Sequence, residues 1–77
     1  MDKSEFYQRL AEILDVEGME GQSVLKEYDG WDSLAVLSVL AMADSKYGVT
    51  IRAEEIRSVV SAADLANLVE AKQRNRS

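Results

Sequence analysis

The pair Asp32-Ser33, within the segment Gly30-Trp31-Asp32-Ser33-Leu34, is the strongest candidate for chemistry in this sequence. A serine hydroxyl accepts covalent groups and becomes a nucleophile when a base activates it. A serine at the start of a helix is also a common cap, and Asp-Ser-Leu by itself is a frequent tripeptide. The position of Ser33 adds weight, because it lies near mid-chain, directly after the longest loop that we expect.

The composition excludes several other kinds of site. The chain of 77 residues has no His and no Cys, so it lacks the commonest general base, a thiolate nucleophile, disulfides and the usual zinc ligands. We expect no metal site and no enzymatic activity. Nine Lys and Arg against 14 Asp and Glu give a net charge of −5, which disfavours nucleic acid as a partner because phosphates attract Lys and Arg.

Length and hydropathy favour one small globular domain. A chain of 77 residues, 47% of them hydrophobic, is long enough for one core and too short for two domains. No apolar run approaches the roughly 20 residues of a membrane span, and the N-terminus lacks the basic and apolar regions of a secretory signal. We therefore expect a complete, cytoplasmic, monomeric protein without membrane insertion.

The elements that would position Ser33 are predicted to be a helix, a long loop and a second helix. Helical spacing predicts a first helix with the buried face Phe6, Leu10, Ile13 and Leu14, capped by Asp2 or Ser4. A long loop over residues 17–31 follows, with three anchors to the core, Val24, Leu25 and Tyr28. The second helix is expected from Ser33 to Tyr47, between Asp32 as N-cap and Gly48 just past its end.

The second helix has two apolar stripes. The inward stripe is predicted to be Val36, Val39, Leu40, Ala43 and Tyr47. The other stripe, Leu34, Leu37 and Ala41, is either a second buried face or an exposed strip that docks partners. The sequence leaves both interpretations open. Ala35, Ser38, Ala41 and Ser45 are expected on or near the outer face.

Two further helices complete the expected fold. A short helix over Ala53 to Arg57 is anchored by Ile56, and it follows a short extended connection, Val49-Thr50-Ile51. A capping box of Ser61 and Asp64 predicts the start of a last helix with Leu65, Leu68 and Val69 inside. The fold class is therefore all-α: a small antiparallel four-helix bundle, three longer helices plus one short helix, with a long first loop.

The sequence resembles the acyl carrier protein family, which includes the peptidyl and D-alanyl carriers. The residues that carry the resemblance are Asp32-Ser33-Leu34 at the head of the second helix and the downstream pattern to Val49-Thr50-Ile51. Ala53-Glu54-Glu55-Ile56 looks like the short third helix of the family, and residues 61–69 look like the fourth. The resemblance implies a single free-standing carrier domain over residues 1–77, folded over about 4–71, with a basic tail over 72–77 that includes Lys72, Arg74 and Arg76.

The resemblance implies that Ser33 is the attachment site of a covalent 4′-phosphopantetheine, transferred from coenzyme A by a phosphopantetheinyl transferase. Asp32 would help to hold the Mg²⁺ of that transferase. The carrier would present acyl thioesters to separate acyl-loading and acyl-transferring enzymes of a fatty-acid-like, lipid or specialised pathway. The expected partner-binding residues are Leu34, Leu37, Ser38, Ala41, Ile51 and Glu54.

The charge pattern departs from the common fatty-acid type, whose second helix usually carries several acidic residues. Here only Asp44 is acidic on that helix, and Lys46 is basic. The negative charge gathers instead in the first loop and the short helix, at Glu17, Glu20, Glu27, Asp29, Glu54 and Glu55. We therefore expect docking to depend more on apolar contact and less on salt-sensitive steering, and a dedicated pathway is our hypothesis.

Several alternatives remain open from the sequence. Trp31 either packs the loop onto the helices or borders the path of the prosthetic arm. Ala43, Ala62, Ala63 and Ala66 either give ordinary close packing or leave room for an acyl chain between helices. The alternative functions are a peptidyl, aryl or D-alanyl carrier and a non-carrier helical protein-interaction domain, in which Ser33 is only a cap. A helix-turn-helix DNA binder is disfavoured by charge.

Overall fold

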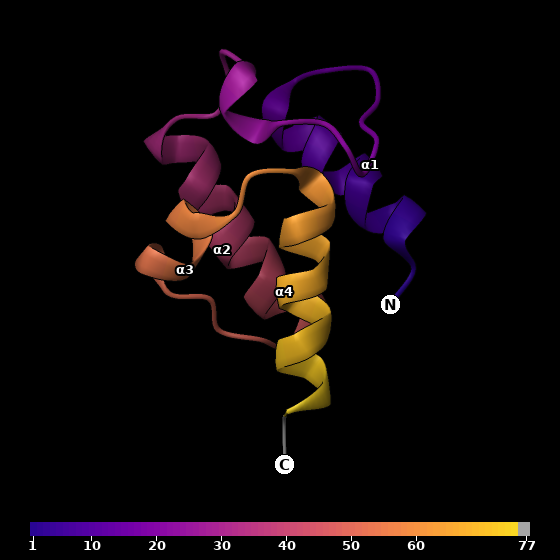
Figure 1. Ribbon diagram of the computed structural model, residues 1–77, viewed down its shortest axis with the longest axis vertical. Coiled ribbons are helices and arrows are strands. Elements are labelled where there is room, and N and C mark those ends of the chain that lie inside the picture. The colour runs from indigo at the N-terminus through magenta and orange to yellow at the C-terminus, as the bar shows by residue number, and fades with distance from the viewer. Residues whose placement is uncertain (76–77) are drawn as a thin grey trace.

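The computed structural model describes residues 1–75 and shows four α-helices, which confirms the all-α prediction (Figure 1). The helices are α1 (Lys3–Leu14), α2 (Ser33–Tyr47), α3 (Ala53–Ser58) and α4 (Ala62–Arg74), and a 3₁₀ turn, η1 (Leu25–Glu27), lies in the first loop. The described residues contain no β-strand, only an isolated antiparallel bridge between Val24 and Ser61. The helix content thus follows the apolar periodicity of the sequence.

The first helix is capped at both ends by aspartates. Asp2 is the N-cap, and its carboxylate accepts a hydrogen bond from the Glu5 amide at 3.2 Å. Asp15 ends α1 in the left-handed conformation, with φ of 58°, which aspartate tolerates better than most residues. Phe6 and Leu10 are fully buried, Leu14 is 4% exposed and Ile13 is half-buried, so three of the four predicted inward residues are confirmed as buried and Ile13 lies at the edge of the core.

The long first loop is held against the start of α4. Leu25, one of the predicted anchors, is 1% exposed, whereas Val24 and Tyr28 are half-buried. The Leu25 amide donates to the Val60 carbonyl at 3.0 Å, and the Ala62 amide donates to the Ser23 carbonyl at 2.9 Å. These backbone hydrogen bonds give the loop a defined path, which ends directly before α2.

The bounds and caps of α2 agree with the prediction. The Asp32 carboxylate accepts a hydrogen bond from the Ala35 amide at 2.9 Å, and Gly48 ends the helix with φ of 67°, which suits a residue without Cβ. Val39 and Ala43 are fully buried. The outward placement of Ala35 was wrong, because Ala35 is 5% exposed and shares the buried face with Val39 and Ala43 at four-residue spacing.

The starts of α3 and α4 are fixed by carboxylates that accept backbone hydrogen bonds. Glu55 accepts from the Arg52 amide at 2.8 Å, and Asp64 accepts from the Val60 and Ser61 amides at 3.1 Å each. The Ser61 hydroxyl accepts from the Asp64 amide at 3.2 Å, so the predicted capping box is confirmed. Ile56 is 2% exposed and anchors α3 as expected.

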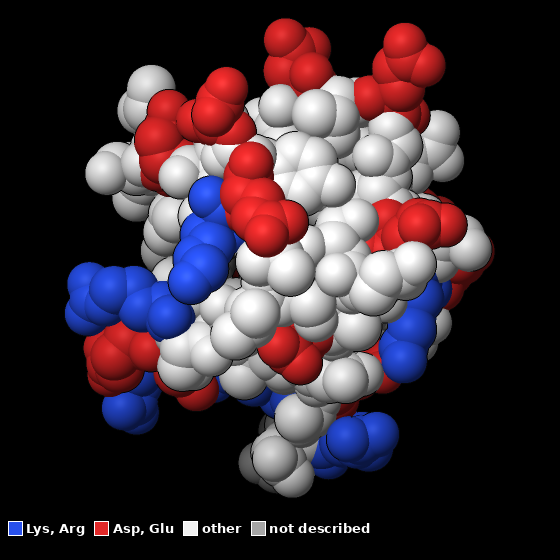
Figure 2. Space-filling view, turned by 45° about the horizontal axis from the view of Figure 1, so that its top comes forward, with Lys and Arg blue, Asp and Glu red and all other residues white. Residues whose placement is uncertain are grey.

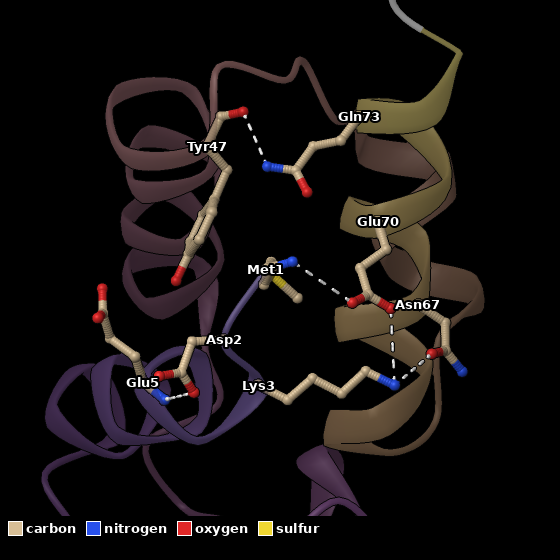
Figure 3. Close-up of polar contacts among 8 residues, drawn as sticks. All are labelled: Met1, Asp2, Lys3, Glu5, Tyr47, Asn67, Glu70 and Gln73. Atoms are coloured by element: carbon tan, nitrogen blue, oxygen red, sulfur yellow. Dashed lines mark hydrogen bonds and ion pairs between the residues drawn. The ribbon is translucent and has the colours of Figure 1, made fainter.

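The last helix continues past the expected boundary at residue 71. α4 runs to Arg74, and Lys72 forms an ion pair with Glu55 of α3, with Nζ and Oε2 2.9 Å apart. Gln73 donates to the Tyr47 carbonyl at 3.4 Å (Figure 3). These contacts stabilise a turn that the sequence assigned to the basic tail. Arg76, also assigned to that tail, lies outside the described residues.

The core lies where α1, α2 and α4 contact one another in pairs. Its largest fully buried side chains include Phe6, Leu10, Leu25 and Leu65. At the edge of α1 and α4, Lys3 contacts Glu70 at 3.6 Å and Asn67 at 3.4 Å (Figure 3). Within residues 1–75, every helix is too short or too polar to cross a bilayer.

Candidate functional site

Ser33 is the first residue of α2, and its side chain is exposed. Asp32, directly before it, is also exposed and already accepts the hydrogen bond from Ala35. The amides of Ser33 and Leu34 find no acceptor within the part of the chain that the structure describes. Free amides and the positive end of the helix dipole favour an anion bound to the Ser33 hydroxyl.

A tight turn sets the position of this serine. The Trp31 amide donates to the Tyr28 carbonyl, and the Asp32 amide donates to the Gly30 carbonyl, both at 3.0 Å. A Cβ atom on Gly30 would lie 3.0 Å from the carbonyl oxygen of Leu14, at the end of α1. The turn therefore packs closely on α1, and a residue without a side chain makes that approach possible.

An apolar groove of about 550 Å³ begins at Ser33 and extends between α2 and α3. Its head is formed by Trp31, Asp32 and Ser33, its α2 side by Val36, Leu37 and Leu40, and its α3 side by Ala53, Ile56 and Arg57. A chain attached to the Ser33 hydroxyl can therefore lie along apolar side chains. The structure brings Trp31 to the groove, half-buried, which favours the interpretation that it borders the path of an attached arm.

The second stripe of α2 is exposed, so the interpretation as a second buried face is wrong. Leu34 is 74% exposed and Leu37 is 61% exposed, and they are among the most exposed large hydrophobic residues described. Ala41 is exposed on the same stripe. Leu34, Leu37 and Ala41 are called the α2 strip below. Large apolar side chains that remain in water on one helix face are typical of a docking surface.

The other expected partner-binding residues divide into two groups. Ser38 on α2 and Glu54 on α3 are exposed, so both are accessible to a partner. Ile51 is 6% exposed and belongs to the core, so the expectation that it lies on the docking surface was wrong. The extended segment before α3 turns the Ile51 side chain inward, where it supports the helices instead.

Charged groups surround an uncharged area on the face drawn in Figure 2. Asp and Glu are most numerous toward the top of that view, Lys and Arg lie at its left, right and lower edges, and mostly uncharged residues occupy the middle. The four acidic loop residues, Glu17, Glu20, Glu27 and Asp29, are all exposed. The protein thus carries much of its negative charge on the loop before Ser33 rather than along α2.

The pKa shifts found near the site belong to the start of α3 and the start of α4. Hydrogen bonds from the Arg52 amide and from Lys72 lower the pKa of Glu55 below its ordinary value. The amides of Ser61 and Val60 lower the pKa of Asp64. Both carboxylates are therefore charged at neutral pH, and Glu55 holds the start of α3, the helix that lines one side of the groove.

Sequence reasoning missed three residues around this groove. Ile56 was assigned only as an anchor, and Arg57 and Lys26 were not assigned at all, yet Arg57 lines the groove and Lys26 lies in an adjoining pocket. No motif marks them, because their proximity to Trp31 depends on how α3 and the first loop pack. Among the described residues, no group of His, Cys, Asp or Glu gathers as a metal site.

Comparison of the chain with protein-family models, with curated proteins and with solved structures gave no match.

Proposed function

We propose that this protein is an acyl carrier protein in which Ser33 bears a covalent 4′-phosphopantetheine, and that its helices form the antiparallel four-helix bundle of that family. The observation that carries the proposal is the placement of one exposed serine hydroxyl at the N-terminus of α2, at the head of an apolar groove of about 550 Å³. The prosthetic group supplies the thiol that this cysteine-free chain lacks. The protein itself is not an enzyme.

The residues at the head of α2 fit a phosphodiester. The free amides of Ser33 and Leu34 and the helix dipole favour an anion there by about 0.3–1 kcal/mol at an exposed site. In the transfer, the Ser33 oxygen attacks the coenzyme A phosphate nearer to pantetheine, the bond between the two phosphates breaks, and adenosine 3′,5′-bisphosphate leaves. The transferase accepts the serine proton and holds Mg²⁺ with help from Asp32, so the chain needs no base of its own.

The α2 strip is the proposed contact surface for partner enzymes. Leu34 and Leu37 would supply the apolar contact, and Ser38 and Glu54 lie exposed beside them on α2 and on α3. Because α2 carries few charges, this docking relies on apolar area rather than on ion pairs. The proposed partners are a phosphopantetheinyl transferase and the loading and transferring enzymes of a dedicated fatty-acid-like, lipid or specialised pathway in the cytoplasm.

A second candidate function is a helical protein-interaction domain with Ser33 as a cap only. The exposure of Leu34 and Leu37 favours it, because an apolar strip docks partners with or without a prosthetic group. The first candidate, a carrier protein, includes peptidyl, aryl and D-alanyl carriers, which share the same attachment chemistry and differ in their cargo. The acyl group released from thioester-linked protein purified from its host distinguishes these cargoes.

Intact mass after incubation with coenzyme A, Mg²⁺ and a broad-range transferase tests the carrier proposal. We expect one phosphopantetheine adduct on the wild-type chain and none on Ser33→Ala. Ser45→Ala is the matched control, because Ser45 is an exposed serine of the same helix outside the proposed contact surface, and it is expected to be modified fully. An adduct that survives Ser33→Ala, or no adduct with several transferases, contradicts the proposal and favours the interaction domain.

A further inference from the structure

A second, smaller pocket adjoins the groove on the side of the first loop. Its volume is about 240 Å³, and it is lined by Lys26, Trp31, Ile56, Arg57, Val59 and Val60. Trp31, Ile56 and Arg57 line both hollows, so the pocket and the groove meet at these three side chains. The pocket therefore adjoins the groove, and Ser33 does not line it.

The lining combines apolar walls with two positive charges and no negative one. Lys26 and Arg57 are the charged residues of the lining, although the whole chain has a net charge of −5. Over the described residues, neither cation is within ion-pair distance of a carboxylate, whereas Lys3, Arg9, Arg52 and Lys72 are all paired. Two exposed, unpaired cations and four largely apolar side chains in one lining suit a ligand that has an apolar body and an anionic end.

The ester phosphate on Ser33 is not that anion. Ser33 and Asp32 line the groove but not the pocket, so the phosphate would lie at the head of the groove. The group that this inference assigns to the pocket is the far end of the arm with its cargo. A tethered cargo has an effective concentration of about millimolar near its own carrier, which favours it over a free anion or an acidic side chain of a partner.

The volume of the pocket suits a small group. At about 30 Å³ for each water-sized group, 240 Å³ holds on the order of eight non-hydrogen atoms. A four- or five-carbon acyl group with a terminal carboxylate is of that size. Its methylene groups would contact Ile56, Val59 and Trp31, and its carboxylate would lie between Lys26 and Arg57.

We propose that this pocket binds the free carboxylate of a short dicarboxylic acid whose other end is held as the thioester, so that the carrier is specific for anionic cargo. The inference rests on the proposed function, because the cargo reaches the pocket only on an arm attached to Ser33. The groove beside Ser33 and the two hollows along α1 are each lined by at most one basic residue.

The test compares two loaded forms of the same carrier that differ in one charge. A broad-range transferase loads the arm from succinyl-coenzyme A or from 4-methylpentanoyl-coenzyme A, whose acyl groups have the same shape, and intact mass confirms each product. Thermal unfolding of the succinyl form is expected at a Tm higher by on the order of 4 °C. Emission of Trp31, the single tryptophan, is expected to differ between the two forms.

Three substitutions identify the source of that difference. Lys26→Gln and Arg57→Gln are each expected to abolish the Tm difference between the two forms. Lys46→Gln, which removes an exposed lysine outside the pocket, is expected to retain it. Because each variant is compared with itself in two loaded forms, a change in its own stability cancels.

The outcomes separate the two proposals. Absence of any adduct overturns the carrier function and the inference with it. Efficient loading with equal Tm values for the two forms overturns the inference alone, as does a difference that survives both Lys26→Gln and Arg57→Gln. A difference that Lys46→Gln also abolishes overturns it as well, because the effect would then reflect net charge rather than this pocket.

Discussion

At the scale of single residues, Asp32 and Ser33 divide two tasks between adjacent side chains. The Asp32 carboxylate caps α2 through the Ala35 amide at 2.9 Å, and this leaves the exposed Ser33 hydroxyl free of a capping role. Serine is itself a good N-cap, so an aspartate one position earlier is what makes the serine available. In the proposed carrier, Asp32 would also help the transferase to hold its metal ion.

Two substitutions of Asp32 separate its structural role from its proposed functional one. Asp32→Ala removes the cap and is expected to lower the free energy of unfolding by about 1 kcal/mol. Asp32→Asn keeps an accepting oxygen and is expected to retain most of that stability, but it removes the charge and should slow phosphopantetheinylation. Urea unfolding measures the first effect and the rate of adduct formation the second. Modification of Asp32→Asn at the wild-type rate would contradict the metal-binding role.

A second residue-scale prediction concerns Tyr47, the last residue of α2. Its hydroxyl is buried and lacks a hydrogen-bond partner in the described structure, and burial raises its pKa. An unsatisfied buried hydroxyl costs free energy in the folded state. Tyr47→Phe keeps the ring packed edge-on against Phe6 and is expected to maintain or raise the Tm. A clear fall in the Tm would show that the hydroxyl has a partner in solution.

At the scale of elements, α3 is a short helix whose position matters more than its length. Its six residues supply one wall of the groove and one wall of the pocket, through Ile56 and Arg57. Glu55 fixes α3 in two ways. It accepts a hydrogen bond from the Arg52 amide, and it forms an ion pair with Lys72 of α4. Displacement of α3 would therefore open the groove and withdraw Ile56 from the core.

The carboxylates at the starts of α3 and α4 predict how stability depends on pH. The pKa of Glu55 and the pKa of Asp64 are lowered from ordinary values of 4.5 and 3.8. The folded state therefore binds these protons less tightly than the unfolded state, so the stabilisation is complete above about pH 5 and is lost as the pH falls through the lowered values. Thermal unfolding from pH 7 to pH 3 should show this loss.

Substitutions of Glu55 and Asp64 test whether these two side chains cause the loss of stability at low pH. Glu55→Gln and Asp64→Asn are expected to unfold at lower temperature at pH 7 and to approach the wild-type Tm near pH 3. Glu17→Gln, an exposed loop substitution, is the control and should follow the wild-type curve throughout. Parallel curves for wild type and both variants would contradict the prediction.

At the scale of the whole molecule, charge and apolar surface lie in different places. The acidic loop residues lie before Ser33, whereas the α2 strip and the groove are mostly uncharged. Ala43, Ala62 and Ala66 are fully buried and Ala63 is half-buried, which supports close packing of α2 and α4. The apolar space beside Ser33 lies instead between α2 and α3, and this is where an attached chain would extend.

This separation leads to a prediction about salt. Partner binding through the α2 strip should change little between low and high ionic strength, because apolar contact is not screened. Leu37→Asp is expected to weaken transfer of the cargo to a partner enzyme severely and to leave the Tm nearly unchanged, since Leu37 is 61% exposed. Transfer assays at two salt concentrations check both parts. Strong inhibition by salt would show that ion pairs govern docking.

The sequence by itself determined which segments are helical, the caps at the starts of α2 and α4, and the place of Ser33. These depend on contacts within one turn, such as Asp32 to Ala35 and Ser61 to Asp64, which are fixed by spacing along the chain. For Ala35, Ile51 and the α2 strip, burial was decided only by the tertiary structure. Ala35 and Ile51 are inside because neighbouring elements cover them, and Leu34 and Leu37 are outside because none does.

The meeting of Lys26, Trp31 and Arg57 likewise required the fold, because the first loop and α3 come together only when both pack beside α2. Lys26 and Trp31 are five residues apart in the sequence and Trp31 and Arg57 are 26 apart, and neither spacing indicates that the three side chains meet. Spacing along the chain specifies which side chains share a helix face, whereas a pocket requires side chains from segments that are distant in sequence and adjacent in space.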